Sequence, residues 1–162
     1  MPHKVIEAEQ FVVRDARGNV HAVLGMRADS APYLALFDLD GRTRAFLTLD
    51  TDGKTGLLLC DTAGKPRVTL SVDSKGAPDL VLQDQAEQVL ARLHTLADSP
   101  ALLLYNTNGE GGAMLSAGPA GMAGLVLSDE NGQARAQLNL LPEGTPRLVF
   151  QDEAGQVNWR AP

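Results

Sequence analysis

The chain has 162 residues, enough for one domain of ordinary size, and a formal net charge of −6 at pH 7. That charge argues against nucleic acid or anionic membrane surfaces as partners, because phosphate binding depends on Lys and Arg. The only cysteine, Cys60, excludes an internal disulfide, and the sequence has neither an apolar leader nor an apolar stretch long enough for a membrane-spanning helix. We therefore expect no direct membrane insertion and favour a cytoplasmic location.

A turn motif that begins with Asp or Asn recurs along the whole chain. It occupies residues 15–18, 38–41, 61–64, 84–87, 106–109, 129–132 and 152–155, with a period of 23 residues that shortens once to 22. The last residue of the motif is Gly in every copy except 84–87, which has Glu87 there. Asp or Asn favours the start of a type I turn, and Gly closes such a loop in the left-handed conformation. The motif therefore predicts seven tight turns.

Apolar residues flank each turn at alternate positions. Four and two residues before the turn stand Phe11 and Val13, Leu34 and Leu36, Leu57 and Leu59, Leu80 and Leu82, Leu102 and Leu104, Leu125 and Leu127, and Leu148 and Phe150. Apolar residues recur seven and nine positions after it, and a spacing of two indicates strands. We expect the side chains at these positions before and after the turn to form the core. The sequence predicts an all-β fold with little or no helix. Seven tandem two-strand repeats would form a single repeat domain over residues 1–162, as a stacked β-hairpin array or a β-solenoid, and the tight turn favours hairpins.

A third apolar series lies on the opposite face of the first strand in each repeat. It comprises Val12, Ala35, Leu58, Val81, Leu103, Val126 and Val149, which we call the third stripe. The second strand is expected to be apolar on one face only, because Arg44, Arg67 and Arg135 recur at a position that should point away from the core. A single-layer sheet would leave the third stripe exposed, so it is our candidate assembly interface.

Two segments depart from the pattern. Residues 85–96 lack the turn Gly and contain good helix formers, but Ala91 and Leu93 keep the repeat register, so a strand is favoured over a helix. Residues 106–124 are rich in Gly, and we interpret them as a longer, mobile connection in preference to a binding loop.

No motif indicates catalysis, a cofactor or a metal. His3, His21 and His94 are dispersed without metal-ligand spacing or a carboxylate partner pattern, and they are interpreted as solvated. Cys60 is interpreted as a half-buried structural thiol. The acidic turns at 38–41 and 50–53 lack the twelfth-position Glu of an EF-hand loop. We therefore expect a protein that is not an enzyme.

The consensus Leu-x-Leu-x-Asp-x-x-Gly-x-x-Arg-Ala-x-Leu stands at 34–47 and is nearly complete at 125–138. It resembles repeats of uncharacterised bacterial and archaeal proteins, and the opening segment 6–15 looks like the start of such arrays. The resemblance implies a repeat fold over nearly the whole chain and brings no established activity. Our hypothesis is a structural module that assembles with itself, as a homo-oligomer or filament, through the third stripe. The alternative is a binding module that displays side chains from a rigid array to a protein or glycan.

Overall fold

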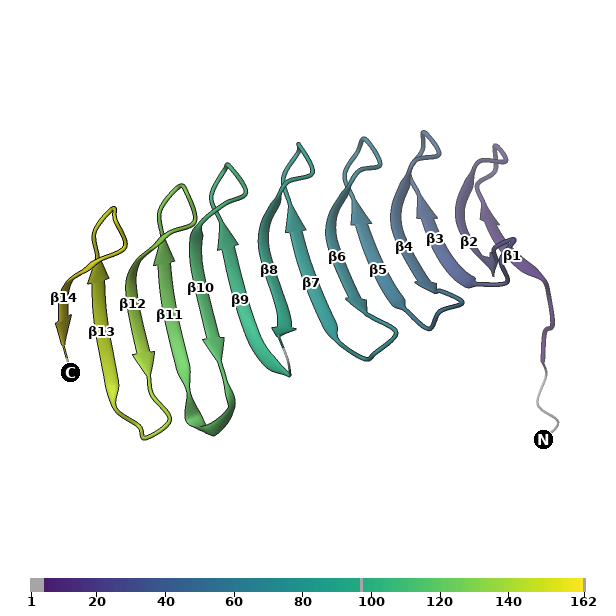
Figure 1. Ribbon diagram of the computed structural model, residues 1–162. Helices are drawn as coiled ribbons and strands as arrows, with labels where there is room; N and C mark the ends of the chain where they lie inside the picture. The colour runs from purple at the N-terminus through teal and green to yellow at the C-terminus, as the bar shows by residue number, and fades with distance from the viewer. Residues whose placement is uncertain (1–4, 97, 162) are drawn as a thin grey trace. The chain divides into compact units, whose positions relative to one another are not determined.

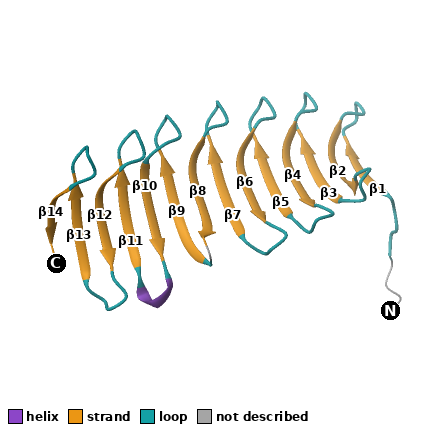
Figure 2. Ribbon diagram, in the orientation of Figure 1, coloured by secondary structure: helices purple, strands orange, loops and turns teal. Residues whose placement is uncertain are grey.

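The computed structural model describes residues 5–96 and 98–161, and over these residues the fold is all-β, as predicted (Figures 1 and 2). The chain divides into two compact units, unit 1 at Met1–Gly76 and unit 2 at Ala77–Pro162. Within each unit every strand is antiparallel to the strands that precede and follow it in the chain. No helix in the described residues is long and apolar enough to cross a membrane.

The strands of unit 1 are β1 (Gln10–Arg14), β2 (Val20–Met26), β3 (Pro32–Phe37), β4 (Thr43–Leu49), β5 (Thr55–Cys60) and β6 (Pro66–Val72). Those of unit 2 are β7 (Pro78–Gln83), β8 (Val89–Leu96), β9 (Ser99–Tyr105), β10 (Gly112–Ala117), β11 (Ala123–Ser128), β12 (Ala134–Leu140), β13 (Pro146–Gln151) and β14 (Val157–Ala161). A single 3₁₀ turn, Pro119–Gly121, connects β10 to β11 (Figure 2).

Each predicted turn is a tight connection between two neighbouring strands. In the β3–β4 hairpin the Gly41 N–H donates to the Asp38 carbonyl oxygen at 3.0 Å, and Gly41 has a φ of 74°. The Asp38 Oδ1 atom accepts the backbone N–H groups of Asp40 at 3.0 Å and Arg42 at 2.9 Å. These bonds fix the turn locally, so its side-chain chemistry explains the recurring Asp.

A β-bulge follows the turn and sets the register. Leu36 pairs with Ala45, but Phe37 pairs with Thr43, so Arg44 is the extra residue. The same shift occurs in the β1–β2, β5–β6, β7–β8, β11–β12 and β13–β14 hairpins. Because the paired strands are neighbours in one sheet, the structure is a hairpin array and the solenoid alternative is wrong.

Equivalent residues of successive repeats lie side by side, because directly paired residues share a face of the sheet. One row runs through Phe11, Leu24, Leu34, Leu47, Leu57 and Leu70 in unit 1, and through Leu80, Leu93, Leu102, Leu115, Leu125, Leu138, Leu148 and Ala161 in unit 2. We call the surface that carries this row the leucine face. The third stripe lies on the opposite face, which we call the stripe face.

The two faces differ in burial, and the difference is opposite to the one expected. The leucine row was expected to be the core, yet Leu47 is 49% exposed and Leu115 is 54% exposed. On the stripe face, Ala35 is 2% and Val149 is 4% exposed. Long side chains explain the difference in unit 1, where the rings of Tyr33 and Phe46 stack at 5.6 Å on the side of the sheet that holds Ala35.

Each of the two irregular segments contains a strand. Residues 89–96 form β8, as predicted, and Glu87 takes the place of the turn Gly with a φ of 66°. The interpretation of 106–124 as a mobile connection is wrong, because it contains β10. Gly111 and Gly112 allow a close backbone approach, since a Cβ at Gly112 would lie closer than 3.0 Å to the Leu104 carbonyl oxygen.

Candidate functional site

The side chains that could act in catalysis make contacts that belong to the fold. In the described part of the chain no group of three or more His, Cys, Asp or Glu is placed to hold a metal ion. Burial, together with the nearby Asp61 carboxylate, raises the pKa of the Cys60 thiol, which is the opposite of what a nucleophile needs. His21 Nε2 lies 3.3 Å from the Asp15 Oδ2 atom, so the expectation of a histidine without a carboxylate partner is wrong there. His3 lies outside the described residues.

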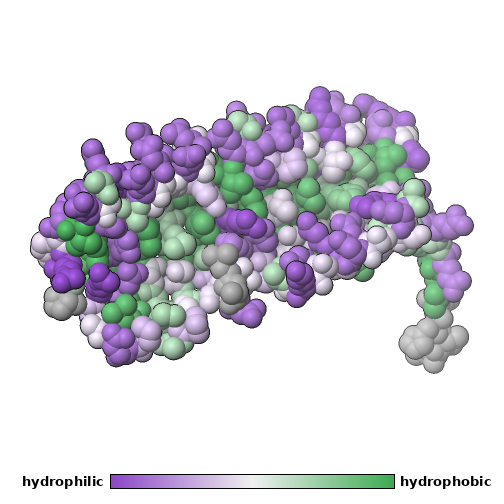
Figure 3. Space-filling model, in the orientation of Figure 1, coloured by the Kyte–Doolittle hydropathy of each residue, from purple (hydrophilic) through white to green (hydrophobic). Residues whose placement is uncertain are grey.

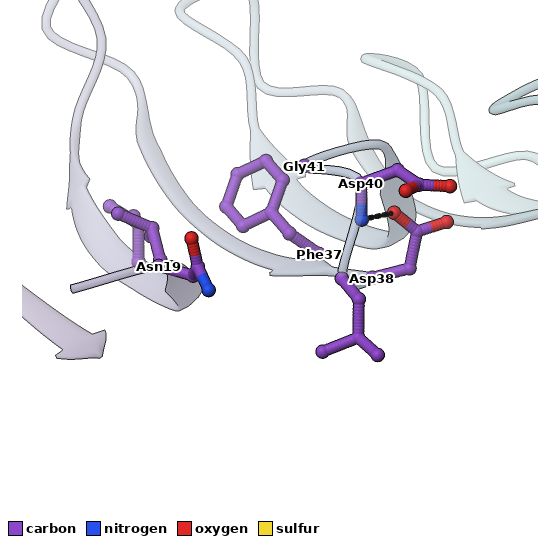
Figure 4. A pocket seen from close by; sticks show the side chains of 8 residues that line it. Asn19, Phe37, Asp38, Asp40 and Gly41 are labelled. Carbon is purple, nitrogen blue, oxygen red and sulfur yellow. Dashed lines mark hydrogen bonds between the residues drawn. The ribbon is translucent and has the colours of Figure 1, made fainter. Parts of the chain in front are cut away.

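A surface hollow of about 430 Å³ lies at the turn end of β2 and β3 in unit 1. The ring of Phe37 stands between Asn19 and the turn that holds Asp38 and Asp40 (Figure 4). One oxygen of Asp38 accepts the backbone N–H of Asp40 at 3.0 Å, so it is engaged in the turn itself. The residues that line the hollow supply neither a nucleophile–base pair nor a cation for an anionic ligand.

The Asp that begins each turn is the centre of a cluster of polar contacts. These clusters recur at the end of the strands where the turns lie. The Asp61 Oδ1 atom accepts the N–H groups of Ala63 at 2.8 Å and Lys65 at 3.0 Å, and its Oδ2 atom pairs with Arg67. These contacts, the Lys65 N–H above all, lower the pKa of Asp61. In the first repeat the Asn19 side chain is the main contact that lowers the pKa of Asp15, to about 2.

Arginine side chains also connect one repeat to the next. The Arg44 Nε atom donates to the Cys60 carbonyl oxygen at 3.1 Å, and the Arg42 Nη1 atom donates to the Thr62 carbonyl oxygen at 3.2 Å. In unit 2 the Arg135 guanidinium pairs with Asp129 and donates to the Asp152 carbonyl oxygen. The bulge arginines were expected to point away into solvent. Arg67 instead pairs with Asp61 of its own turn, while Arg44 and Arg135 also reach the following repeat, so their charge stays at the end of the strands where the turns lie.

The leucine face presents a row of apolar side chains in each unit, several of them about half exposed, such as Leu47 and Leu115. A second row on it alternates large and small residues: Leu36, Ala45, Leu59 and Val68 in unit 1, and Leu82, Ala91, Leu104, Ala113, Leu127 and Ala136 in unit 2. In unit 1 three leucines of the first row, Leu24, Leu34 and Leu47, border an almost wholly apolar hollow of about 270 Å³. On the side of the molecule drawn in Figure 3, hydrophobic side chains along the middle of the strands are interrupted by hydrophilic ones, and hydrophilic side chains gather over the turns.

Within each unit the structure aligns the residues of the third stripe on one face, but most of them expose little surface. Val12 is 37% exposed at the edge strand, whereas Ala35 and Val149 are buried, and Leu58, Val81, Leu103 and Val126 are half-buried. The residues between them in the cross-strand rows are long, for example Phe46, Arg92 and Gln137. The exposed leucine row was missed as a surface. The signal that could have revealed it is the size of those intervening side chains.

No protein-family model and no curated protein matches the chain. Among solved structures, the TCP10 domain of Danio rerio CPAP matches at 15% identity with a TM-score of 0.32, covering 93% of each chain. The same domain in complex with a peptide of Danio rerio STIL matches at 13% identity with a TM-score of 0.20, covering 94% of this chain and 98% of that one. These matches are too distant to bear on function.

Proposed function

We propose that the protein is a non-catalytic structural module that assembles with itself through its leucine face. The supporting observation is that aliphatic side chains along this face, in both units, stay about half exposed without a second layer to cover them. Contiguous apolar surfaces of this kind are uncommon on soluble monomers and usually mark interaction sites.

The exposed area supports a partner of substantial size. The chain exposes 11093 Å². A compact monomer of this length exposes about 7,800 Å², so the surplus is roughly 3,300 Å². A stable protein–protein interface buries about 1,600 Å² in total. The surplus is about twice the area that such an interface buries.

A second copy of the chain fits this face best. The face has a regular period and alternates large and small residues, so the ridges of one copy can pack between those of another, as in two-layer sandwiches. The aligned rows carry no charged residue, because the arginine and aspartate pairs lie at the turns or on the stripe face. The rows therefore have no charged side chain that would select a charged partner.

The test is the mass of the native particle for matched lysine variants. Leu47→Lys and Leu115→Lys place a charge in the leucine rows of the two units, and Leu39→Lys is the control, since Leu39 is 80% exposed in a turn. We expect light scattering to show an oligomer for the wild-type chain and the control, and smaller particles for the two row variants with unchanged circular dichroism. A wild-type monomer in dilute buffer would refute self-assembly and favour the alternative, a module whose face binds another protein or a glycan.

A further inference from the structure

The two outermost strands of the array have unsatisfied edges. In the described residues 5–96 and 98–161, β1 pairs with β2 alone and β14 pairs with β13 alone. Exposed edges present unpaired N–H and C=O groups that can add another strand, and proteins often protect them with charged side chains, Pro or bulges. β1 and β14 contain neither Pro nor Lys, and each carries a single Arg. Each strand instead has large exposed apolar residues, including Val13 at 59% and Trp159 at 49%.

The chain itself shows how such edges fit together. Within each unit, where the second strand of one repeat pairs with the first strand of the next, the residue seven after a turn Asp or Asn lies opposite the residue two before the next turn. This register is observed for Ala22 and Leu36, Ala45 and Leu59, Ala91 and Leu104, Ala113 and Leu127, and Ala136 and Phe150. Because β1 is a first strand and β14 is a second strand, the two edges have matching phase and opposite direction.

We infer that β14 of one copy pairs with β1 of a second copy, so that copies join end to end. The repeat register places Trp159 opposite Val13, Arg160 opposite Val12 and Ala161 opposite Phe11 of the second copy. An aromatic residue opposite a β-branched residue is among the favourable cross-strand pairs. The ring of Trp159 already contacts Phe150 on its other side, at a centroid distance of 5.4 Å. The aliphatic rows of one copy continue into those of the next.

This contact is heterologous, since the two partners use different surfaces. Each joined pair leaves a free β1 and a free β14, so association does not stop at a dimer. The inference deepens the proposed self-assembly but depends on strand edges and not on the leucine face. The two contacts can therefore fail separately.

Charge at the position opposite Arg160 tests the register. Val12→Lys puts a like charge directly opposite Arg160 of the neighbouring copy, whereas Val12→Glu puts an opposite charge there. Both replace the same partly exposed residue with a long side chain, so they form a matched pair for folding. Sedimentation velocity over a range of concentrations, for the otherwise unchanged full-length chain and for the Leu47→Lys chain, measures the association.

We expect a concentration-dependent series of species that lengthens without a fixed end. Val12→Lys should weaken end association by about tenfold, while Val12→Glu should leave it equal or stronger. The double variant Val12→Lys/Arg160→Glu should restore it, and high salt should shrink the differences. Equal behaviour of the Lys and Glu variants, or particles of one fixed size in the wild-type chain, would overturn the inference. If Leu47→Lys lowers the particle mass while the two Val12 variants associate equally, the results support only face-to-face assembly.

Discussion

The sharpest prediction concerns the β9–β10 hairpin, where two glycines that look alike in sequence have different reasons to be glycine. Gly109 closes the turn with a φ of 75°, and a Cβ there would meet nothing within 4 Å. Gly112 has a φ of 119°, and its Cβ would fall closer than 3.0 Å to the Leu104 carbonyl oxygen. Leu104 is held in the sheet by pairing with Ala91 and Ala113, so its backbone cannot easily move away.

The expected cost of each alanine follows from these differences. Gly109→Ala adds only the backbone penalty, about 1–2 kcal/mol for the left-handed region, less about 0.4–1 kcal/mol gained by restricting the unfolded chain. We expect about 1 kcal/mol. Gly112→Ala adds overpacking against a fixed carbonyl group, about 1–3 kcal/mol more. The expected difference between the two variants is therefore about 2 kcal/mol.

The assay is urea unfolding followed by the fluorescence of Trp159, the only tryptophan of the chain, which lies in the same unit as both glycines. Free energies of unfolding come from the midpoint and slope of each transition. If Gly112→Ala destabilises the unit no more than Gly109→Ala does, the close approach of the two backbones is not a constraint and the reasoning fails.

Three further outcomes are expected. Glu87→Gly should stabilise the protein by roughly 0.5 kcal/mol, because Glu87 holds a φ of 66° that costs a side chain about 1–2 kcal/mol; a lower midpoint in urea would contradict this. The lowered pKa of Asp61 means that its contribution is complete above about pH 4 and is lost as pH falls through the folded value. Asp61→Asn, which keeps an acceptor for the turn but loses the charge beside Arg67, should flatten that acid-side decline, measured as urea midpoint against pH. Deleting 114–136, one period, should leave a strand-rich circular dichroism spectrum, whereas deleting 114–124 should not, because an odd shift turns the leucine row to the other face.

Most of the fold follows from the period of the sequence. Asp or Asn and Gly at fixed separation place the turns, and apolar residues at every second position place the strands and their register. The sequence even predicts β8, because Ala91 and Leu93 hold the register in spite of helix-forming neighbours. The sequence leaves the hairpin array and the solenoid open, because both place alternate apolar residues on one face. The structure distinguishes them by the antiparallel pairing of successive strands, for example Leu36 with Ala45.

The burial of the two faces could not be predicted from the same period. Both faces are apolar at the positions that define the repeat, so the pattern alone does not rank them. The ranking depends on the residues eight after each turn, which vary from Phe46 to Thr69 to Arg92. Arg92 illustrates the point, since its guanidinium pairs with Asp79 at 2.8 and 2.9 Å. Such contacts depend on individual side chains that vary between repeats, so the consensus of the repeat does not contain them.

The order of the strands has a consequence for how the protein is made. Within each unit a strand touches chiefly the strands just before and after it in the chain, so nearly all pairings close loops of a few residues. All-β proteins usually fold slowly because distant segments must meet first. We expect this chain to avoid that delay, because each hairpin can pair with the preceding strand soon after it is synthesised. Synthesis and folding would then advance together, one turn at a time.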